Sequence, residues 1–379
     1  MAKIPFLDLK LVNAPYMESL KAAASAVVES GWYIRGTYCT EFENAFAKYC
    51  GKEYGVGVGN GLDALTLMLR AEIELGRLSV GDEILVPSNT YIATVLAVSA
   101  AGLVPRPVEP EAKTFNIDPS RLEAACTEKT RGIMAVHLYG RAADMSRICA
   151  FARERGLMVF EDCAQAHGAL GVCAGDASAF SFYPTKNLGA LGDAGMVLTD
   201  DAELARVVRM LGNYGSEIKY VNKFRGVNSR LDDLQAAFLL AKLPHLEEWN
   251  ARRREIAARY CREIRNPLIE LPEYPENPRE HVWHVFTVRT SEKKTRDALQ
   301  VYLESRGIGT LVFYPIPPHL QEAYGSTENS AFKNGLLGLP GDYPIAEKMA
   351  ETVLSIPISQ VLTDSEVDDI IGAMNGFVG

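Results

Sequence analysis

YGVGVGNGLDALTLMLR, residues 54–70, is a short β-rich run that passes through several glycines into an amphipathic segment. Six more β-rich runs follow it: EILV (83–86), VPRPV (104–108), GIMAV (132–136), LMVFE (157–161), ASAFSF (177–182) and GMVLT (195–199). Helical patterns separate several of them, at 63–75, 94–101 and 145–155. This alternation predicts the α/β class, with a large, mostly parallel sheet covered by helices on both faces. Such sheets bind ligands beyond the carboxyl ends of their strands.

The pattern changes in the C-terminal third of the chain. Residues 231–264 read as helical with an interruption at Pro244, and a shorter set of elements follows beyond Pro267. That set comprises VWHVFTV (282–288), a helix near 295–306, TLVF (310–313) and a closing helix near 365–377. We therefore expect a large domain over residues 1–245 and a smaller α/β domain over residues 246–379.

Composition excludes several classes of protein. The chain has 379 residues with 39 Lys and Arg against 48 Asp and Glu, a formal charge of −9, which does not favour binding to nucleic acid or anionic membranes. No apolar run reaches the ~18–20 residues of a membrane span, and MAKIPFLDLK does not resemble a secretory signal, so a cytoplasmic protein is expected. The seven cysteines form no CxxC pair, and His281 with His284 is only a weak metal signal, so no metal is predicted.

Glycines 55, 57, 59 and 61 lie where a predicted strand meets a predicted helix. Backbone N–H groups at such a junction can hold a phosphate, although a tight turn without a ligand has the same pattern. Residues 59–64 also fit the G-x-G-x-x-A form of the dinucleotide fingerprint. That fingerprint requires an acid at the end of the next strand, which instead reads Val86-Pro-Ser-Asn89. A nicotinamide enzyme is therefore disfavoured.

Two further segments carry reactive groups. LMVFEDCAQAHGA (157–169) ends an apolar run in Asp162, which could pair with a cationic ring nitrogen or could simply cap a helix. In SFYPTKNLG (181–189), Lys186 follows another predicted strand. Partial burial there would favour the neutral amine that condenses with aldehydes, whereas an ordinary exposed lysine would have no such role.

The three segments together match one cofactor. A phosphate cradle, a carboxylate for a ring nitrogen and an amine for an aldehyde are what pyridoxal 5′-phosphate requires of a protein. They occur at separate ends of strands in one predicted sheet, and Tyr91 could stack on the pyridine ring.

These segments resemble motifs of the DegT/DnrJ/StrS-type sugar-nucleotide aminotransferases, which are fold-type I pyridoxal-phosphate enzymes with an aspartate aminotransferase-like fold. The matching motifs are EDCAQAHG (161–168), SFYPTKN (181–187) and GVNSRLD (226–232), and the resemblance extends nearly from end to end. It implies that Lys186 bonds the cofactor aldehyde and carries the proton, that Asp162 pairs with the ring nitrogen, and that Gln165 bonds the ring 3′-oxygen.

The resemblance also implies a phosphate site and a shared active site. Ser181 and the backbone amides around Gly61, Leu62 and Asp63 would bind the phosphate. Leu62 lacks the hydroxyl that is common there in the family, so backbone contacts must suffice. Asn228 would reach the cofactor phosphate of a neighbouring subunit, so a homodimer is expected.

Within this family, GVGVGNGLDAL (55–65), NYGSEIKY (213–220) and GVNSRLD are similar to a subgroup that aminates C3 of dTDP-linked 3-keto-6-deoxyhexoses with L-glutamate as donor. The product would be a dTDP-3-amino-3,6-dideoxyhexose for cell-surface polysaccharide or a glycosylated natural product. Lysine at 186, where a dehydratase branch has histidine, favours transamination. The candidates for substrate contacts are Tyr183, Tyr214, Lys219, Arg225, Tyr314 and His319. The alternatives are a different keto-sugar nucleotide (a C4 ketone, UDP or GDP) and a non-catalytic regulatory protein that binds the cofactor.

Overall fold

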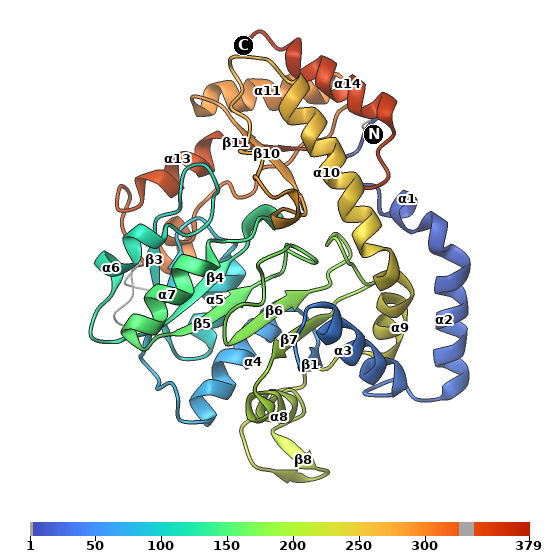
Figure 1. Cartoon of the computed structure of the whole chain (residues 1–379), viewed down its shortest axis with the longest axis vertical. Helices are drawn as coiled ribbons and strands as arrows, with labels where there is room; N and C mark the ends of the chain where they lie inside the picture. Colours follow the sequence, from blue (N-terminus) through green and yellow to red (C-terminus); the bar gives the residue numbers. More distant parts are fainter. Residues whose placement is uncertain (1–2, 326–336) are drawn as a thin grey trace.

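The computed structural model describes residues 3–325 and 337–379 of the chain (Figure 1). A seven-stranded sheet forms its centre, in the order β1-β7-β6-β5-β4-β2-β3. Within this sheet β7 runs antiparallel to both of its neighbours, and the other pairs are parallel. The strands are β1 (Tyr54–Val58), β2 (Glu83–Pro87), β3 (Val104–Val108), β4 (Thr130–Val136), β5 (Met158–Asp162), β6 (Ala177–Ser181) and β7 (Gly195–Thr199). The predicted parallel sheet is therefore confirmed.

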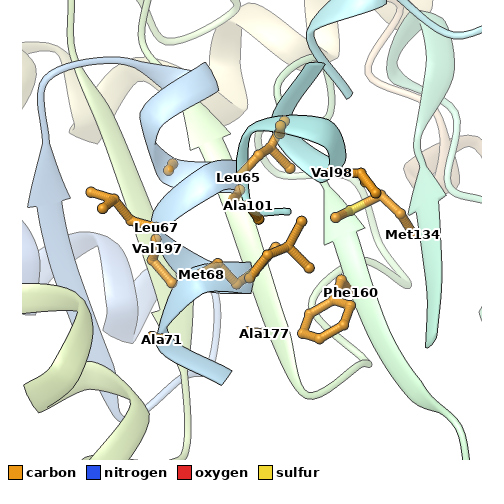
Figure 2. Close-up of a cluster of buried hydrophobic side chains, with 14 of the residues drawn as sticks. Leu65, Leu67, Met68, Ala71, Val98, Ala101, Met134, Phe160, Ala177 and Val197 are labelled. Atoms are coloured by element: carbon orange, nitrogen blue, oxygen red, sulfur yellow. The ribbon is translucent and has the colours of Figure 1, made fainter. Parts of the chain in front are cut away.

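Helices cover both faces of this sheet because successive strand residues are apolar on opposite sides. On one face, Met134 and Phe160 pack with α4 and α5, as Figure 2 shows. On the other, Ile133 and Val159 pack with α7, and Phe180 packs with α3 and α9. The covering helices are α3 (Thr37–Tyr49), α4 (Gly61–Glu74), α5 (Ile92–Ala100), α7 (Met145–Arg155), α8 (Ala202–Leu211) and α9 (Asp233–Lys242).

A second core lies in the C-terminal part, at the end of the molecule where Figure 1 places both termini. Its antiparallel pair of strands is β10 (Phe286–Arg289) and β11 (Val353–Ile356), and α10, α11 and α14 pack against it. Ile4, near the N-terminus, also belongs to this core and pairs with Ile308. The division at residues 245/246 would fall where α10 begins, and it stays a prediction.

The remaining elements connect or border these two cores. They are α1 (Leu9–Asn13), α2 (Met17–Ser30), α6 (Leu122–Ala125), β8 (Ser216–Ile218), β9 (Val221–Asn222), α10 (Leu246–Glu263), α11 (Lys293–Ser305), α12 (Glu322–Gly325), α13 (Pro344–Thr352) and α14 (Asp364–Asn375). A helix long and apolar enough to cross a bilayer does not occur among the described residues.

Two C-terminal strands differ from the sequence-based expectation. The run 282–288 is a strand only from Phe286, because Trp283 has a positive φ of 48° that interrupts extended pairing before it. TLVF (310–313) is not a strand, since only Leu311 pairs, through a single bridge to Ser355. The partner of β10 is instead β11, which follows α13 directly without the turn residues that would have marked its start.

Candidate active site

A cavity of about 510 Å³ lies beyond the carboxyl ends of the parallel strands. Its walls come from the segments that follow β1, β2, β4, β5 and β6, with one further wall from the C-terminal part of the chain. Nine of the residues singled out from the sequence line it: Gly61, Leu62, Tyr91, Asp162, Gln165, Ser181, Tyr183, Lys186 and Tyr314. Parallel strands bring these residues together because their carboxyl ends meet at one edge of the sheet.

Asp162 is the last residue of β5, and its side chain is buried. The hydroxyl of Thr94 donates to Oδ2 at 2.8 Å, and the N–H of Ala164 donates to Oδ1 at 3.1 Å. Thr94 lies on α5, so two elements fix the carboxyl group. Each oxygen keeps a lone pair for one more donor on the cavity side, such as a protonated ring nitrogen.

Gln165 has a defined orientation. Its Oε1 accepts the backbone N–H of Tyr139 at 2.6 Å, so its Nε2 is the group that donates to the hydroxyl of Tyr314 at 3.0 Å. An amide nitrogen carries two hydrogens, and the second can serve a ring oxygen in the cavity. The ring of Tyr314 lies 5.0 Å from that of Tyr91, so the two aromatic side chains share one side of the cavity.

The first turn of α4 forms one end of the cavity. Asn60 caps this helix by accepting the N–H of Asp63 at 2.8 Å, so that N–H is already used. The first backbone donors of a helix have no intrahelical acceptor, which leaves the N–H groups of Gly61 and Leu62 for an anion. A Cβ on Gly61 would lie 2.5 Å from Cβ of Ser181, so glycine is required for the serine to approach these donors.

Lys186 lies in the turn after β6, where its N–H donates to the carbonyl of Tyr183 at 2.8 Å. Burial lowers the pKa of its amine to about 8, and the opposing charge of Asp162 limits the fall. Desolvation favours the neutral amine, the form that attacks a carbonyl. This agrees with the partial burial expected from the sequence.

The pKa of Lys186 gives a testable pH dependence. Because the folded chain holds this pKa below that of a free lysine, the amine loses its proton at lower pH than an exposed lysine does. In the cofactor-free protein, acylation of Lys186 should reach half of its maximal rate near pH 8. Labelling across pH followed by peptide mass spectrometry measures this, with an unstructured lysine peptide as control. An identical midpoint for Lys186 and the peptide would contradict it.

The structure does not bring every predicted site residue to the cavity. Among the described residues, Asp63, Asn228, Tyr214, Lys219, Arg225 and His319 are absent from its lining. His319 is buried, with its Nε2 3.0 Å from a carboxylate oxygen of Glu347, so we do not retain it as a substrate contact. Asn228, Tyr214, Lys219 and Arg225 are exposed and lie together in the segment 213–228.

Thr94 and His284 are site residues that the sequence analysis did not assign. The hydroxyl of Thr94 donates to Asp162, but Thr94 lies in a run of residues that are common in any helix. Nothing in that run indicates a site residue. His284 lines the cavity, and its Nδ1 lies 3.1 Å from Oδ1 of Asn187. We considered it only as half of a metal pair with His281, whose Nδ1 instead accepts the N–H of Trp283. The two rings therefore have separate partners.

A second buried histidine also has a structural partner. His137 accepts the N–H of Ala143 on Nδ1, so its proton is on Nε2, which donates to Glu161 at 2.8 Å. Burial acts to raise the pKa of Glu161, but this contact and two backbone N–H groups outweigh it and hold that pKa below its ordinary value. The hydrogen bond between His137 and Glu161 therefore connects the end of β4 to β5, next to Asp162.

Pyridoxal phosphate fits this set of groups. Two free helix N–H groups and a serine hydroxyl suit its phosphate, Asp162 suits the ring nitrogen, and the amide of Gln165 suits the ring oxygen. The amine of Lys186, with its lowered pKa, suits the aldehyde. The residues thus span one cavity with a donor or acceptor for each polar atom of the cofactor.

Comparison with known proteins agrees with this geometry. The model of the DegT/DnrJ/EryC1/StrS aminotransferase family matches residues 16–375. A dTDP-3-amino-3,6-dideoxy-alpha-D-galactopyranose transaminase of Aneurinibacillus thermoaerophilus is 50% identical, with 99% of each chain covered. The erythromycin biosynthesis sensory transduction protein EryC1 of Saccharopolyspora erythraea is 46% identical, with 98% of each covered. The crystal structure of S. venezuelae DesV superposes with a TM-score of 0.91 at 44% identity, covering 99% of this chain and 98% of that one. The chain therefore belongs to the DegT/DnrJ/EryC1/StrS aminotransferase family and is a pyridoxal-phosphate-dependent aminotransferase.

Proposed function

We propose that this enzyme transfers the amino group of L-glutamate to C3 of a dTDP-linked 3-keto-6-deoxyhexose. The products would be 2-oxoglutarate and a dTDP-3-amino-3,6-dideoxyhexose. The observation that carries the proposal is the single cavity in which Lys186, Asp162, Gln165 and the α4 N-terminus meet. The name of the 50% identical relative supports the sugar and the carbon atom, because that relative forms a 3-amino-3,6-dideoxy sugar linked to dTDP.

The residues of the cavity have distinct tasks in this reaction. Pyridoxal phosphate supplies an aldehyde that accepts the donor's amino group and a ring that takes up the electron pair released when a C–H bond breaks. Asp162 would keep the ring nitrogen protonated by pairing with it. Lys186 would remove the proton from the carbon that bears the amine and return it later in the cycle. Gly61, Leu62 and Ser181 would anchor the phosphate and prevent the ring from shifting.

Tyr183 and Tyr314 are the two predicted substrate contacts that remain at the cavity. Their hydroxyl groups can bond the hydroxyls of a sugar, and their rings give an apolar edge to the site. We propose them as contacts to the hexose.

Product analysis with a panel of keto-sugar nucleotides tests the substrate. Purified enzyme receives L-glutamate and, in separate reactions, a dTDP-3-keto-6-deoxyhexose, its 4-keto isomer, and UDP- and GDP-linked ketones. We expect 2-oxoglutarate and an aminated sugar from the first, identified by mass spectrometry, and much slower turnover of the others. Faster amination of a 4-keto or UDP-linked sugar would contradict the proposed substrate.

We also propose a homodimer with shared active sites. Tyr214, Lys219, Arg225 and Asn228 are exposed and lie outside the cavity of their own chain. The hydroxyl of Ser229, next to Asn228, donates to Asp63 at 2.6 Å, so this segment is tied to the first turn of α4. Exposed apolar side chains, including Ile218 and Tyr220 in or beside the β8–β9 hairpin, are typical of a surface that a second subunit covers.

Subunit mixing tests this arrangement. Lys186→Ala and Asn228→Ala each impair every site of their own homodimer. In a mixed dimer, one site would combine an intact Lys186 with the other subunit's intact Asn228. We therefore expect mixed subunits to recover up to about half of the wild-type activity per mixed dimer, since one of two sites is complete. Absence of any recovery in dimers shown by mass spectrometry to be mixed would contradict shared sites.

A regulatory role is the alternative, because the 46% identical relative bears the name of a sensory transduction protein. The presence of Lys186, Asp162 and Gln165 together in one cavity favours catalysis instead. Failure to form 2-oxoglutarate with every sugar of the panel would support the alternative. We further infer a cytoplasmic location, which the seven free cysteines support because free thiols are usual in reducing compartments.

A further inference from the structure

His284 reaches the cavity from the C-terminal part of the chain, where it lies two residues before β10. Its backbone is held on both sides, since its N–H donates to the carbonyl of Tyr139 at 2.9 Å and its carbonyl accepts from Arg253 at 3.3 Å. The backbone that carries the ring is therefore fixed by two other segments of the chain, those of Tyr139 and Arg253. It lines the same cavity as Lys186.

A chain of amide groups determines which way this ring is oriented. The Nδ2 of Asn250 donates to the backbone carbonyl of His167 at 2.8 Å, so its Oδ1 must accept. The Nδ2 of Asn187 donates to that Oδ1 at 2.9 Å and to the carbonyl of Val282 at 3.0 Å. Backbone carbonyls can only accept, so neither amide can be reversed without losing these bonds.

The position of the proton on His284 follows from this chain. Because both hydrogens of the Asn187 amide are used, its Oδ1 faces Nδ1 of His284 at 3.1 Å as an acceptor. The proton must therefore be on Nδ1, and Nε2 has only a lone pair. No protein partner of Nε2 occurs among the hydrogen bonds of the described residues, and the ring faces the cavity.

The charge state of the ring agrees with this arrangement. Burial, followed by the charges of Lys186 and Arg253, lowers the pKa of His284 well below that of a free imidazole. The ring is neutral at working pH, so it cannot donate from Nε2 or act there as an acid. It can only accept a hydrogen bond.

We propose that the Nε2 lone pair of His284 accepts an N–H of Lys186 whenever that amine is not bonded to the cofactor, and that Asn187 and Asn250 hold the ring in this orientation. An amine that donates one N–H in this way keeps its own lone pair free for the proton of the substrate carbon. His284 is thus a positioning residue for Lys186. The proposal rests on the proposed role of Lys186, but the orientation of the ring can be tested separately.

Nitrogen-15 NMR of histidine-labelled holoenzyme tests the orientation and the contact. The chain has six histidines, and the variant His284→Gln assigns the signals of residue 284. We expect the Nδ1–H tautomer, and a change in the Nε2 shift when glutamate converts the cofactor to its amino form and releases Lys186. A proton on Nε2, or an Nε2 shift that is the same in both forms, would overturn the proposal. Neither outcome depends on whether the sugar substrate has been identified correctly.

A pair of amide variants tests the consequence for catalysis. Asparagine at 284 can still donate to Asn187 from the position of Nδ1, but it ends short of Nε2, whereas glutamine can present an acceptor near Nε2. We expect kcat of His284→Asn to be about 2–10-fold below that of His284→Gln, the effect of one hydrogen bond between neutral groups. KM for glutamate should differ less than about twofold between them. Equal kcat values, or a higher value for asparagine, would indicate a merely structural role and overturn the proposal. If one of the two variants fails to fold by circular dichroism, the other still assigns the signals of residue 284, and the NMR experiment decides.

Discussion

Replacement of Lys186 by alanine should lower kcat for glutamate and the keto-sugar by about 10²–10⁴-fold, the usual contribution of a positioned acid–base group. The cavity offers no second amine, because Lys186 is the one lysine in its described lining. Water admitted by the smaller side chain is a poor base at neutral pH. Formation of 2-oxoglutarate measures the rate. Absorbance spectra should show that the cofactor still binds but has lost the visible band of its lysine-bound form.

Two controls separate this loss from damage to the fold. Lys294→Ala removes an exposed lysine from α11, outside the cavity, and should leave kcat unchanged. Added methylamine should restore part of the activity of Lys186→Ala, because a free amine can replace the missing base. A Lys186→Ala enzyme with the wild-type rate would refute the proposed role.

Asp162→Asn should lower kcat by about 10²–10³-fold, the range seen when one electrostatic stabiliser is removed from an active site. The amide has nearly the same shape, and its oxygen can still accept the N–H of Ala164 while its nitrogen donates to the hydroxyl of Thr94, but it carries no charge. A ring nitrogen without its counter-charge loses its proton more readily, so the ring withdraws electrons less effectively. KM for glutamate should change little, because Asp162 would act on the cofactor and not on the donor.

Asp144→Asn is the matched control. Asp144 caps α7 by accepting the N–H of Arg147, and asparagine caps helices equally well. The same chemical change at this position should leave both kcat and stability nearly unchanged. An Asp162→Asn enzyme as active as this control would show that Asp162 is not needed to keep the ring nitrogen protonated.

Much of the site could be predicted from local sequence patterns. The β-rich runs that end near Val58, Asp162 and Ser181 predicted strands, and chemistry-bearing residues follow each one. Parallel strands align their carboxyl ends, so Gly61, Gln165 and Lys186 could be expected at one edge of the sheet from the sequence alone. The family resemblance added the roles of these residues, which geometry alone does not assign.

Finer details depended on contacts between distant parts of the chain. Asn60 uses the N–H of Asp63 that we had assigned to the phosphate, and the burial of His319 against Glu347 removes it from the substrate contacts. His284 was considered only as half of a weak metal pair, since its partner Asn187 is nearly a hundred residues away.

The sequence by itself was sufficient to predict the strands of the large sheet, several of the helices that cover it and three segments that line the cavity, because periodicity and strand ends are local properties of the chain. Only the tertiary structure decided which backbone donors remain free and which nitrogen of His284 bonds Asn187. Hydrogen-bond partners compete for each polar atom, and the outcome depends on how α10 and the loop before β10 pack against the turn after β6.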